Sequence, residues 1–138
     1  MDLLTKFKID IVTPEKIIYS DNATMLVLPG EDGEFAVLHN HIPIVSSIKE
    51  GFILIYDNST VIEKFFVEDG FVEVTSNEGT VVLVDRAFPA MNVKLLEIEQ
   101  IISELRNKLN VDIKDFENYL IEKDIEFYNK LITAISDK

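Results

Sequence analysis

The fold is decided by residues 6–14, which read Lys6-Phe7-Lys8-Ile9-Asp10-Ile11-Val12-Thr13-Pro14. Apolar side chains at positions 7, 9 and 11 alternate with charged ones at positions 6, 8 and 10, which is the period of a strand with one buried face. Thr13-Pro14 ends the run, because proline has no N–H to offer a sheet. The stretch therefore predicts the first strand of a β-rich domain.

Similar short apolar runs follow at residues 16–19, 25–28, 35–38, 44–48, 52–56, 61–67, 71–75 and 81–84. Turn-forming residues separate many of them, at Asp21-Asn22, Pro29-Gly30, Asp57-Asn58-Ser59, Asp69-Gly70 and Asn77-Glu78-Gly79. About nine strands with no helical stretch between them are typical of an antiparallel sandwich or a flattened barrel. The pattern predicts such a domain over residues 1–88.

The apolar period changes after Pro89, where a helical stripe follows at Leu95, Ile98, Ile102, Leu105 and Leu109. Asn110-Val111 interrupts it, and Asp112, with Asp115 three positions on, is the expected N-cap of a second helix that ends near Ile135. That helix has two apolar rows, Phe116, Leu120, Phe127, Leu131 and Ala134 beside Ile121, Ile125, Tyr128, Ile132 and Ile135. One partner helix covers a single stripe, so the rest must meet the sandwich or another protein. Residues 89–138 are therefore predicted to form an antiparallel two-helix hairpin, and the fold class is mainly β plus α.

The composition excludes several classes of function. The 138 residues hold 13 Lys and Arg against 25 Asp and Glu, and the net charge of −12 repels a nucleic-acid backbone. No cysteine is present, which excludes disulfides and thiolate chemistry. The first ten residues lack the apolar stretch of a signal peptide, and no run approaches the roughly 20 apolar residues of a membrane span. We expect any membrane association to come through a protein partner, with no nucleic acid bound.

The sequence offers one feature that resembles an enzyme, the pair His39-Asn40-His41 five residues after Gly33, which imitates half of a cupin metal motif. The Glu and the third His of that motif are missing, so a turn is the favoured interpretation. The carboxylates are spread over turns, and the acidic Gly30-Glu31-Asp32-Gly33-Glu34 would repel the phosphate that a P-loop binds. We therefore predict no catalytic, metal-binding or cofactor-binding residue. A stand-alone cupin-like metal- or ligand-binding β-sandwich remains as the alternative.

Four segments in order carry a family resemblance: Phe7 to Glu15, Gly30 to Val45 closing at Ile48-Lys49-Glu50-Gly51, Phe66 to Val74, and Val81 to Ala87. They include a Gly-Glu-rich turn, a His-x-Pro corner at His41 to Pro43 and a Lys-x-Gly exit. The sequence resembles the epsilon subunit of the F-type ATP synthase over about two-thirds of its length. A β-sandwich followed by a helical hairpin is also the architecture that this resemblance implies.

The resemblance implies a non-catalytic part of the rotating central stalk, which couples proton flow through the c-ring to ATP synthesis. Its implied partners are the gamma subunit, the c-subunit ring and, through the hairpin, the alpha and beta catalytic subunits. The implied location is peripheral, on the cytoplasmic face of the bacterial inner membrane. The expected contact residues are Glu31, Asp32, Glu34, His41 and Pro43 on the ring and gamma side, with Phe116, Leu120, Phe127 and Leu131 on the second helix.

The hairpin departs from the family at its start. Many bacterial members carry Ile-Asp-x-x-Arg-Ala there, residues tied to ATP binding, whereas this chain reads Val93-Lys94-Leu95-Leu96-Glu97-Ile98. Lys94 replaces the acid and Glu97 replaces the arginine, so we expect no ATP binding by the hairpin. The second helix also carries more acids than lysines, so apolar burial of Phe116, Leu120, Phe127 and Leu131 is expected to hold the hairpin folded.

Overall fold

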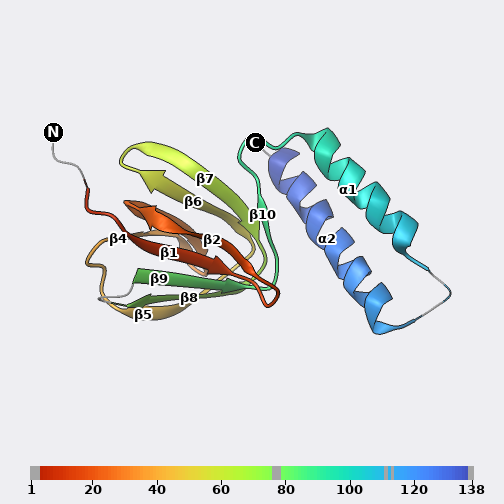
Figure 1. The fold of residues 1–138 in the computed structure, drawn as a ribbon, viewed down its shortest axis with the longest axis horizontal. Coiled ribbons are helices and arrows are strands. Elements are labelled where there is room, and N and C mark those ends of the chain that lie inside the picture. The colour runs from red at the N-terminus through yellow and green to blue at the C-terminus, as the bar shows by residue number, and fades with distance from the viewer. Residues whose placement is uncertain (1–3, 76–78, 111, 113, 137–138) are drawn as a thin grey trace. The chain divides into compact units, whose positions relative to one another are not determined.

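A computed structural model describes residues 4–75, 79–110, 112 and 114–136 of the chain. It divides into two compact units, Met1–Met91 and Asn92–Lys138. The first unit is built from strands and the second from two helices (Figure 1). The predicted turn residues Asn77 and Glu78 and the predicted helix break at Val111 lie outside the described residues.

The first unit contains a 10-stranded sheet. Its strands are β1 (Phe7–Val12), β2 (Ile17–Ala23), β3 (Met25–Gly30), β4 (Gly33–Leu38), β5 (Ile44–Ile48), β6 (Gly51–Asp57), β7 (Thr60–Val67), β8 (Gly70–Thr75), β9 (Gly79–Val84) and β10 (Ala87–Pro89). The order across the sheet is β10-β7-β6-β3-β5-β8-β9-β1-β2, and β4 pairs with β3 outside this path. β1 and β9 run parallel, whereas the other neighbours in the described sheet are antiparallel. A parallel pair is possible there because β1 and β9 come from distant parts of the chain and need no tight turn.

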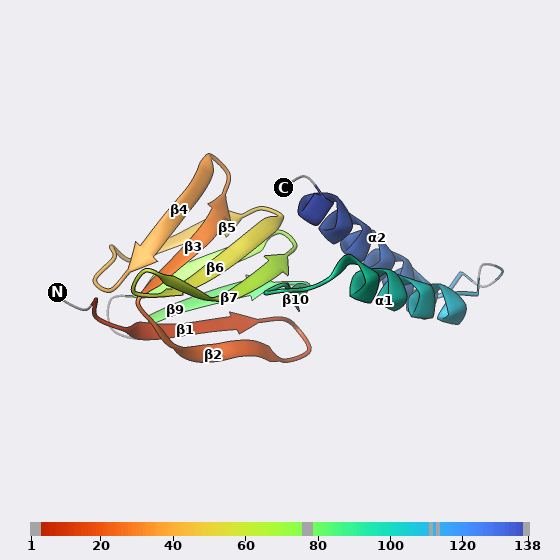
Figure 2. The same ribbon diagram turned by 90° about the horizontal axis from the view of Figure 1, so that it is seen from above.

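The sheet curls on itself around one apolar core, as the view in Figure 2 shows. Ile9 and Ile11 are fully buried in that core, as the alternation of residues 6–11 predicts. Tyr19 on β2 meets Phe65 on β7 edge to face, with ring centroids 5.8 Å apart, so strands far apart in the sheet order come together. The predicted sandwich or flattened barrel is confirmed.

Two predicted turns lie at different residues in the structure. Asp21 and Asn22 lie inside β2, because they continue the ladder with Ile9 and Lys8 of β1. The turn falls at Thr24, whose hydroxyl donates to the Tyr56 carbonyl over 3.0 Å.

The predicted turn at Pro29-Gly30 is likewise part of a strand, β3. Gly30 pairs with Gly33, which leaves a two-residue turn at Glu31-Asp32. Gly33 has φ +122, a conformation that residues with a Cβ rarely adopt, and this allows so tight a reversal.

The predicted strands omit β10, because the sequence pattern places Phe88 and Pro89 at the junction before the helices. Phe88 instead pairs with Phe66 of β7, and Pro89 pairs with Phe65. Proline is tolerated there because β10 is the edge of the sheet. The Ala90 N–H then donates to the Lys64 carbonyl over 2.7 Å.

The second unit consists of α1 (Leu95–Lys108) and α2 (Phe116–Ser136). The two helices lie side by side and antiparallel in both views (Figures 1 and 2), so the predicted hairpin is confirmed. The predicted N-cap Asp112 is wrong by one turn, because the Asp115 carboxylate accepts the Asn118 N–H over 2.9 Å. Asn118 also holds the turn, since its amide donates to the Asn110 carbonyl over 2.6 Å and accepts the Asn110 N–H over 3.2 Å.

Candidate functional site

The acidic residues predicted to contact partners lie at one end of the sandwich. Glu31 and Asp32 form the β3–β4 turn, and Glu34 follows on β4, all three exposed. The Ser47 hydroxyl donates to the Glu31 carboxylate over 3.4 Å, which links the turn to β5. Four residues at this end of the sheet pair in succession across neighbouring strands. Gly30 of β3 pairs with Ile48 of β5, Ile48 pairs with Gly70 of β8, and Gly70 pairs with Val84 of β9.

The other two predicted contact residues of the sandwich lie beyond the opposite end of β4. His39 and Asn40 form the turn after β4, with Asn40 at φ 69, and His41 and Pro43 follow. The His41 ring nitrogen Nδ1 lies 2.8 Å from the Ile42 carbonyl oxygen. At about 3.3 Å per residue, six residues of β4 keep the two groups roughly 20 Å apart. The structure therefore does not gather these residues at one point, but places them along the edge strand β4.

The four predicted contact residues of α2 divide into two pairs. Phe127 and Leu131 are buried, with 2% and 0% of their surface exposed. Phe116 is 71% exposed and Leu120 is 38% exposed, so the expectation that all four are buried in a folded hairpin is wrong for these two. The first turns of α2 instead bury Asn118, which is 7% exposed. Phe116 stacks on the ring of Tyr119 instead, at 6.3 Å between centroids.

A third surface was not predicted from the sequence. On the outward face of the sheet, Phe71 of β8 pairs with Leu83 of β9, and Leu83 pairs with Val12 of β1. Phe71 is 57% exposed and Leu83 is 51% exposed. Residues directly opposite each other point to the same side of a sheet, so these side chains form one row. Ile17 of β2, which pairs with Val12, extends the row, whereas Val45 of β5 lies on the same face but opposite Glu73 of β8, two positions from the partner of Phe71. We call Val45, Phe71, Leu83, Val12 and Ile17 the outer apolar row.

The sequence did hold a signal for this row. Val81-Val82-Leu83-Val84 is apolar at both parities, a pattern typical of a strand that is covered on both faces. Val82 and Val84 face the core, with 0% and 4% exposed, whereas Leu83 faces outward. An outward face of this kind in a sheet that covers only one core indicates a missing partner.

The cupin-like alternative depends on how the possible metal ligands lie. Among them, no group of three or more His, Asp or Glu side chains is placed to hold a metal ion. His39 and His41 belong to a turn and the loop after it, so they are not held side by side on a strand as the cupin-like alternative requires. Neither described helix is long and apolar enough to cross a membrane.

Comparison with known proteins identifies the sandwich first. Residues 6–90 match the sequence model of the β-sandwich domain of the ATP synthase delta/epsilon chain. The structure is also similar to a chain in the Euglena gracilis mitochondrial ATP synthase, in an assembly of OSCP, F1 and c-ring, with a TM-score of 0.63 at 15% identity. That match covers 98% of this chain and 84% of the other. A chain of the Tetrahymena thermophila central stalk and c-ring matches with a TM-score of 0.54 at 14% identity, over 99% and 98% of the two chains. At these identities the structures support the fold alone.

Sequence relatives carry the assignment further. The ATP synthase epsilon chain of Pelagibacter ubique is 34% identical over 128 residues, which cover 91% of this chain and 97% of the relative. That of Rhodospirillum rubrum is 39% identical over 79 residues, 57% of this chain and 58% of the relative. The chain therefore belongs to the family of ATP synthase epsilon chains.

Proposed function

We propose that this chain is a non-catalytic epsilon subunit, which binds the gamma subunit in the central stalk and transmits torque between the c-ring and the catalytic subunits. Family membership supports this role, together with solved assemblies of similar fold that contain a central stalk and a c-ring. We further propose that the chain lies on the cytoplasmic face of a bacterial inner membrane, where its partners hold it.

The observation that carries the proposal is the outer apolar row. Phe71 and Leu83 are large apolar side chains, each more than half exposed on regular strands, and they are neighbours. Contact between large apolar side chains and water is unfavourable, and monomeric proteins rarely expose such side chains side by side. Neighbouring exposed apolar side chains therefore indicate a protein interface. A stable interface covers about 800 Å² on each partner, so the row would form the apolar centre of a larger contact surface. We assign this face to the gamma subunit.

The ring side is assigned to β4. Because the acidic turn and the His41 corner lie at opposite ends of this edge strand, a partner that contacts both must lie along the strand. Glu31, Asp32 and Glu34 supply negative charge at one end, and the imidazole of His41 stands at the other. Charged contacts at the rim of an interface set orientation and association rate more than affinity.

The hairpin is proposed to be a weak regulator of ATP hydrolysis. Lys94 lies at the start of α1 and its side chain makes no capping hydrogen bond, while Glu97 lies in the first turn. A phosphate placed there would meet a carboxylate where the family's motif has arginine, so ATP is not expected to bind. Phe116 and Tyr119 at the start of α2 are exposed and stacked, and they offer the catalytic subunits an apolar contact.

Co-elution tests the proposal. The purified chain is mixed with the gamma subunit of the same synthase at micromolar concentration and passed through a sizing column. We expect a single peak that contains both proteins and a free-chain peak that disappears at equimolar ratio. Separate elution, with a gamma preparation that still assembles with alpha and beta subunits, would refute the proposal.

A further inference from the structure

The strand β4 is open along one side. Among the described strands it pairs with β3 alone, from Gly30 and Gly33 at the turn to Met25 and Leu38 at the far end. In Figure 2 no described strand lies on its other side. Because a strand can pair along both of its edges, β4 has room for one further strand.

The tight turn fixes which backbone groups of β4 face the open edge. Gly30 and Gly33 flank a two-residue turn, so they exchange hydrogen bonds, and this bonding recurs at every second residue pair of the ladder. The N–H and C=O groups of Glu34 and Ala36 therefore point away from β3. These two residues offer two donors and two acceptors to a partner strand.

Two hydrogen bonds agree with this alternation. Pro29 lies opposite Glu34 and has no N–H, and its carbonyl accepts the Lys49 N–H over 2.8 Å instead of bonding to β4. At the far end of the strand, the Leu38 carbonyl accepts the His41 N–H over 3.1 Å, so the following turn satisfies it. The open stretch of the edge therefore ends at Leu38.

The other two edges of the described sheet are protected, whereas β4 is not. β10 is three residues long and ends in Pro89, which has no N–H. β2 has a register shift in its ladder with β1, and its Tyr19 packs edge to face on Phe65 of β7. β4 holds six residues in an unbroken register, without proline or lysine. Natural proteins rarely leave such an edge uncovered, which indicates a partner for it.

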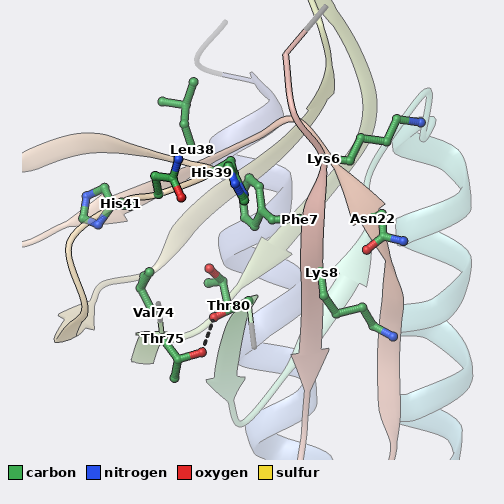
Figure 3. A pocket seen from close by; sticks show the side chains of 12 residues that line it. Lys6, Phe7, Lys8, Asn22, Leu38, His39, His41, Val74, Thr75 and Thr80 are labelled. Carbon is green, nitrogen blue, oxygen red and sulfur yellow. Dashed lines mark hydrogen bonds between the residues drawn. The ribbon is translucent and has the colours of Figure 1, made fainter. Parts of the chain in front are cut away.

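The side chains of β4 define the kind of segment that fits. Val37 is fully buried and Phe35 packs against the core, so an added strand meets apolar side chains on its inner face. Glu34, Ala36 and Leu38 are exposed on the other face. Figure 3 shows the Leu38 side chain pointing away from β8 and β9. A partner strand of alternating character matches these two faces.

Charge distinguishes the two ends of the open edge. Glu34 is exposed next to the acidic turn of Glu31 and Asp32. The other end carries His39 and His41, which line a cavity of about 240 Å³ (Figure 3), and positions 35–49 hold no acidic residue. Opposite charges on neighbouring strands attract, so the partner segment is expected to carry Lys or Arg beside Glu34.

We propose that the open edge of β4 binds an extended segment of the gamma subunit as an added strand, with a basic side chain beside Glu34 and an apolar one beside Phe35. Main-chain hydrogen bonds supply affinity in this mode of binding, and the alternating side chains supply specificity. The inference rests on the proposed function, because it names how a stalk partner holds the sandwich. The short connections between membrane-spanning helices rarely form an extended run of about five residues, so the strand is assigned to gamma and the acidic turn stays available to the ring.

Amide hydrogen exchange compares the free chain with its complex with the gamma subunit, in the presence and absence of the c-ring. In the free chain, the N–H groups of Glu34 and Ala36 should exchange faster than those of Phe35 and Val37, which bond to β3. We expect gamma alone to slow exchange at Glu34 and Ala36 at least tenfold, because an added strand accepts their hydrogen bonds.

Matched variants test the backbone contact and the charge separately. Ala36→Pro removes an outward N–H, a change that edge strands tolerate, and should weaken gamma binding at least tenfold. Ala36→Ser keeps the N–H and should bind like the wild type. Glu34→Gln should weaken binding about threefold at low salt and less at high salt, while Glu104→Gln, exposed on α1, should have no effect. Unchanged amide signals of the buried Val82 verify that each variant is folded.

The possible results separate this inference from the proposed function. Unchanged exchange at Glu34 and Ala36 in a complex that does form would overturn the added strand and leave the proposed function standing. Slower exchange that requires the c-ring would also overturn it, because gamma then does not supply the strand. Equal gamma affinity in folded Ala36→Pro and Ala36→Ser would contradict it as well. A chain that does not bind gamma at all would refute both proposals.

Discussion

The sandwich and the hairpin differ in how their apolar residues are buried. The sandwich encloses one continuous core to which strands from β1 to β9 contribute, with Leu26, Leu28 and Ile55 fully buried. In the described part of the hairpin, the buried apolar side chains are Ile98, Ile102, Phe127 and Leu131, while Leu96 and Phe116 are 65% and 71% exposed. Short helices owe most of their stability to packing, so the hairpin is the weaker unit and the one suited to rearrange.

The largest expected effect on stability is that of a core truncation in the sandwich. Leu28→Ala removes a fully buried side chain and should lower the free energy of unfolding by about 2–5 kcal/mol. Leu38→Ala, at a position that is 38% exposed on β4, is the matched control and should cost less than about 1 kcal/mol. Amide NMR signals of each unit, followed through a urea titration, measure the effect. If Leu28→Ala lowers the midpoints of both units equally, they unfold as one and the comparison fails.

A smaller effect is expected for the clamp at the hairpin turn. Asn118 is 7% exposed and both ends of its amide bond to the Asn110 backbone. Asn118→Ala leaves those backbone groups without their partner, which should cost the hairpin about 1–3 kcal/mol. Amide hydrogen exchange should accelerate in α1 and α2 and stay unchanged in the sandwich. Asn129→Ala, exposed on the same helix, is the control. Equal acceleration in both variants would show that the clamp does not hold the turn.

Removal of the hairpin should change activity modestly. Deletion of residues 92–138 keeps β10 and the Ala90 N–H bond to Lys64, so the sandwich is expected to fold and assemble. We predict that ATP hydrolysis by the reconstituted enzyme rises by less than about tenfold, equivalent to about 1.4 kcal/mol. Much larger activation would identify the hairpin as a strong inhibitor despite its acidic charge.

The smallest expected effect is the titration of Tyr19 in the sandwich. Burial, followed by the charges of Asp21 and Glu63, raises the pKa of Tyr19 above its ordinary value of 10.0. The unfolded chain then loses this proton first, so the stabilising contribution is complete below about pH 10 and is lost as the pH rises through the folded pKa. Tyr19→Phe should flatten the pH dependence of the melting temperature in this range. An unchanged slope would contradict the assignment.

The sequence predicts those elements in which one face alone is buried. The alternation of residues 6–11 gives β1, and the stripe at Ile98 and Ile102 gives the buried face of α1. The sequence predicts turns less well, because Asp21 and Gly30 have turn propensities that a long cross-strand ladder overrides. β10 was missed because a short edge strand ending in proline has no period of its own.

The contact residues were harder to predict, since the interface depends on which side chains are exposed. Phe127 and Phe116 belong to the same helical row, yet one is buried and the other exposed, a difference set by where the partner helix lies. Phe71 and Leu83 read as ordinary strand residues until the register places them side by side on the outward face. Pairing between distant strands is not encoded in local patterns.

The central claim, that the outer apolar row binds the gamma subunit, is tested most directly by one affinity comparison. The Kd for gamma is measured for the wild-type chain and for the double variant Phe71→Thr, Leu83→Thr, which keeps strand propensity while removing apolar surface. Ile62→Thr, at a position that is 37% exposed on β7, serves as the control. We predict that the double variant binds at least tenfold more weakly, about 1.4 kcal/mol, while the control binds like the wild type. Equal affinities for the double variant and the wild type, with both chains folded, would contradict the account.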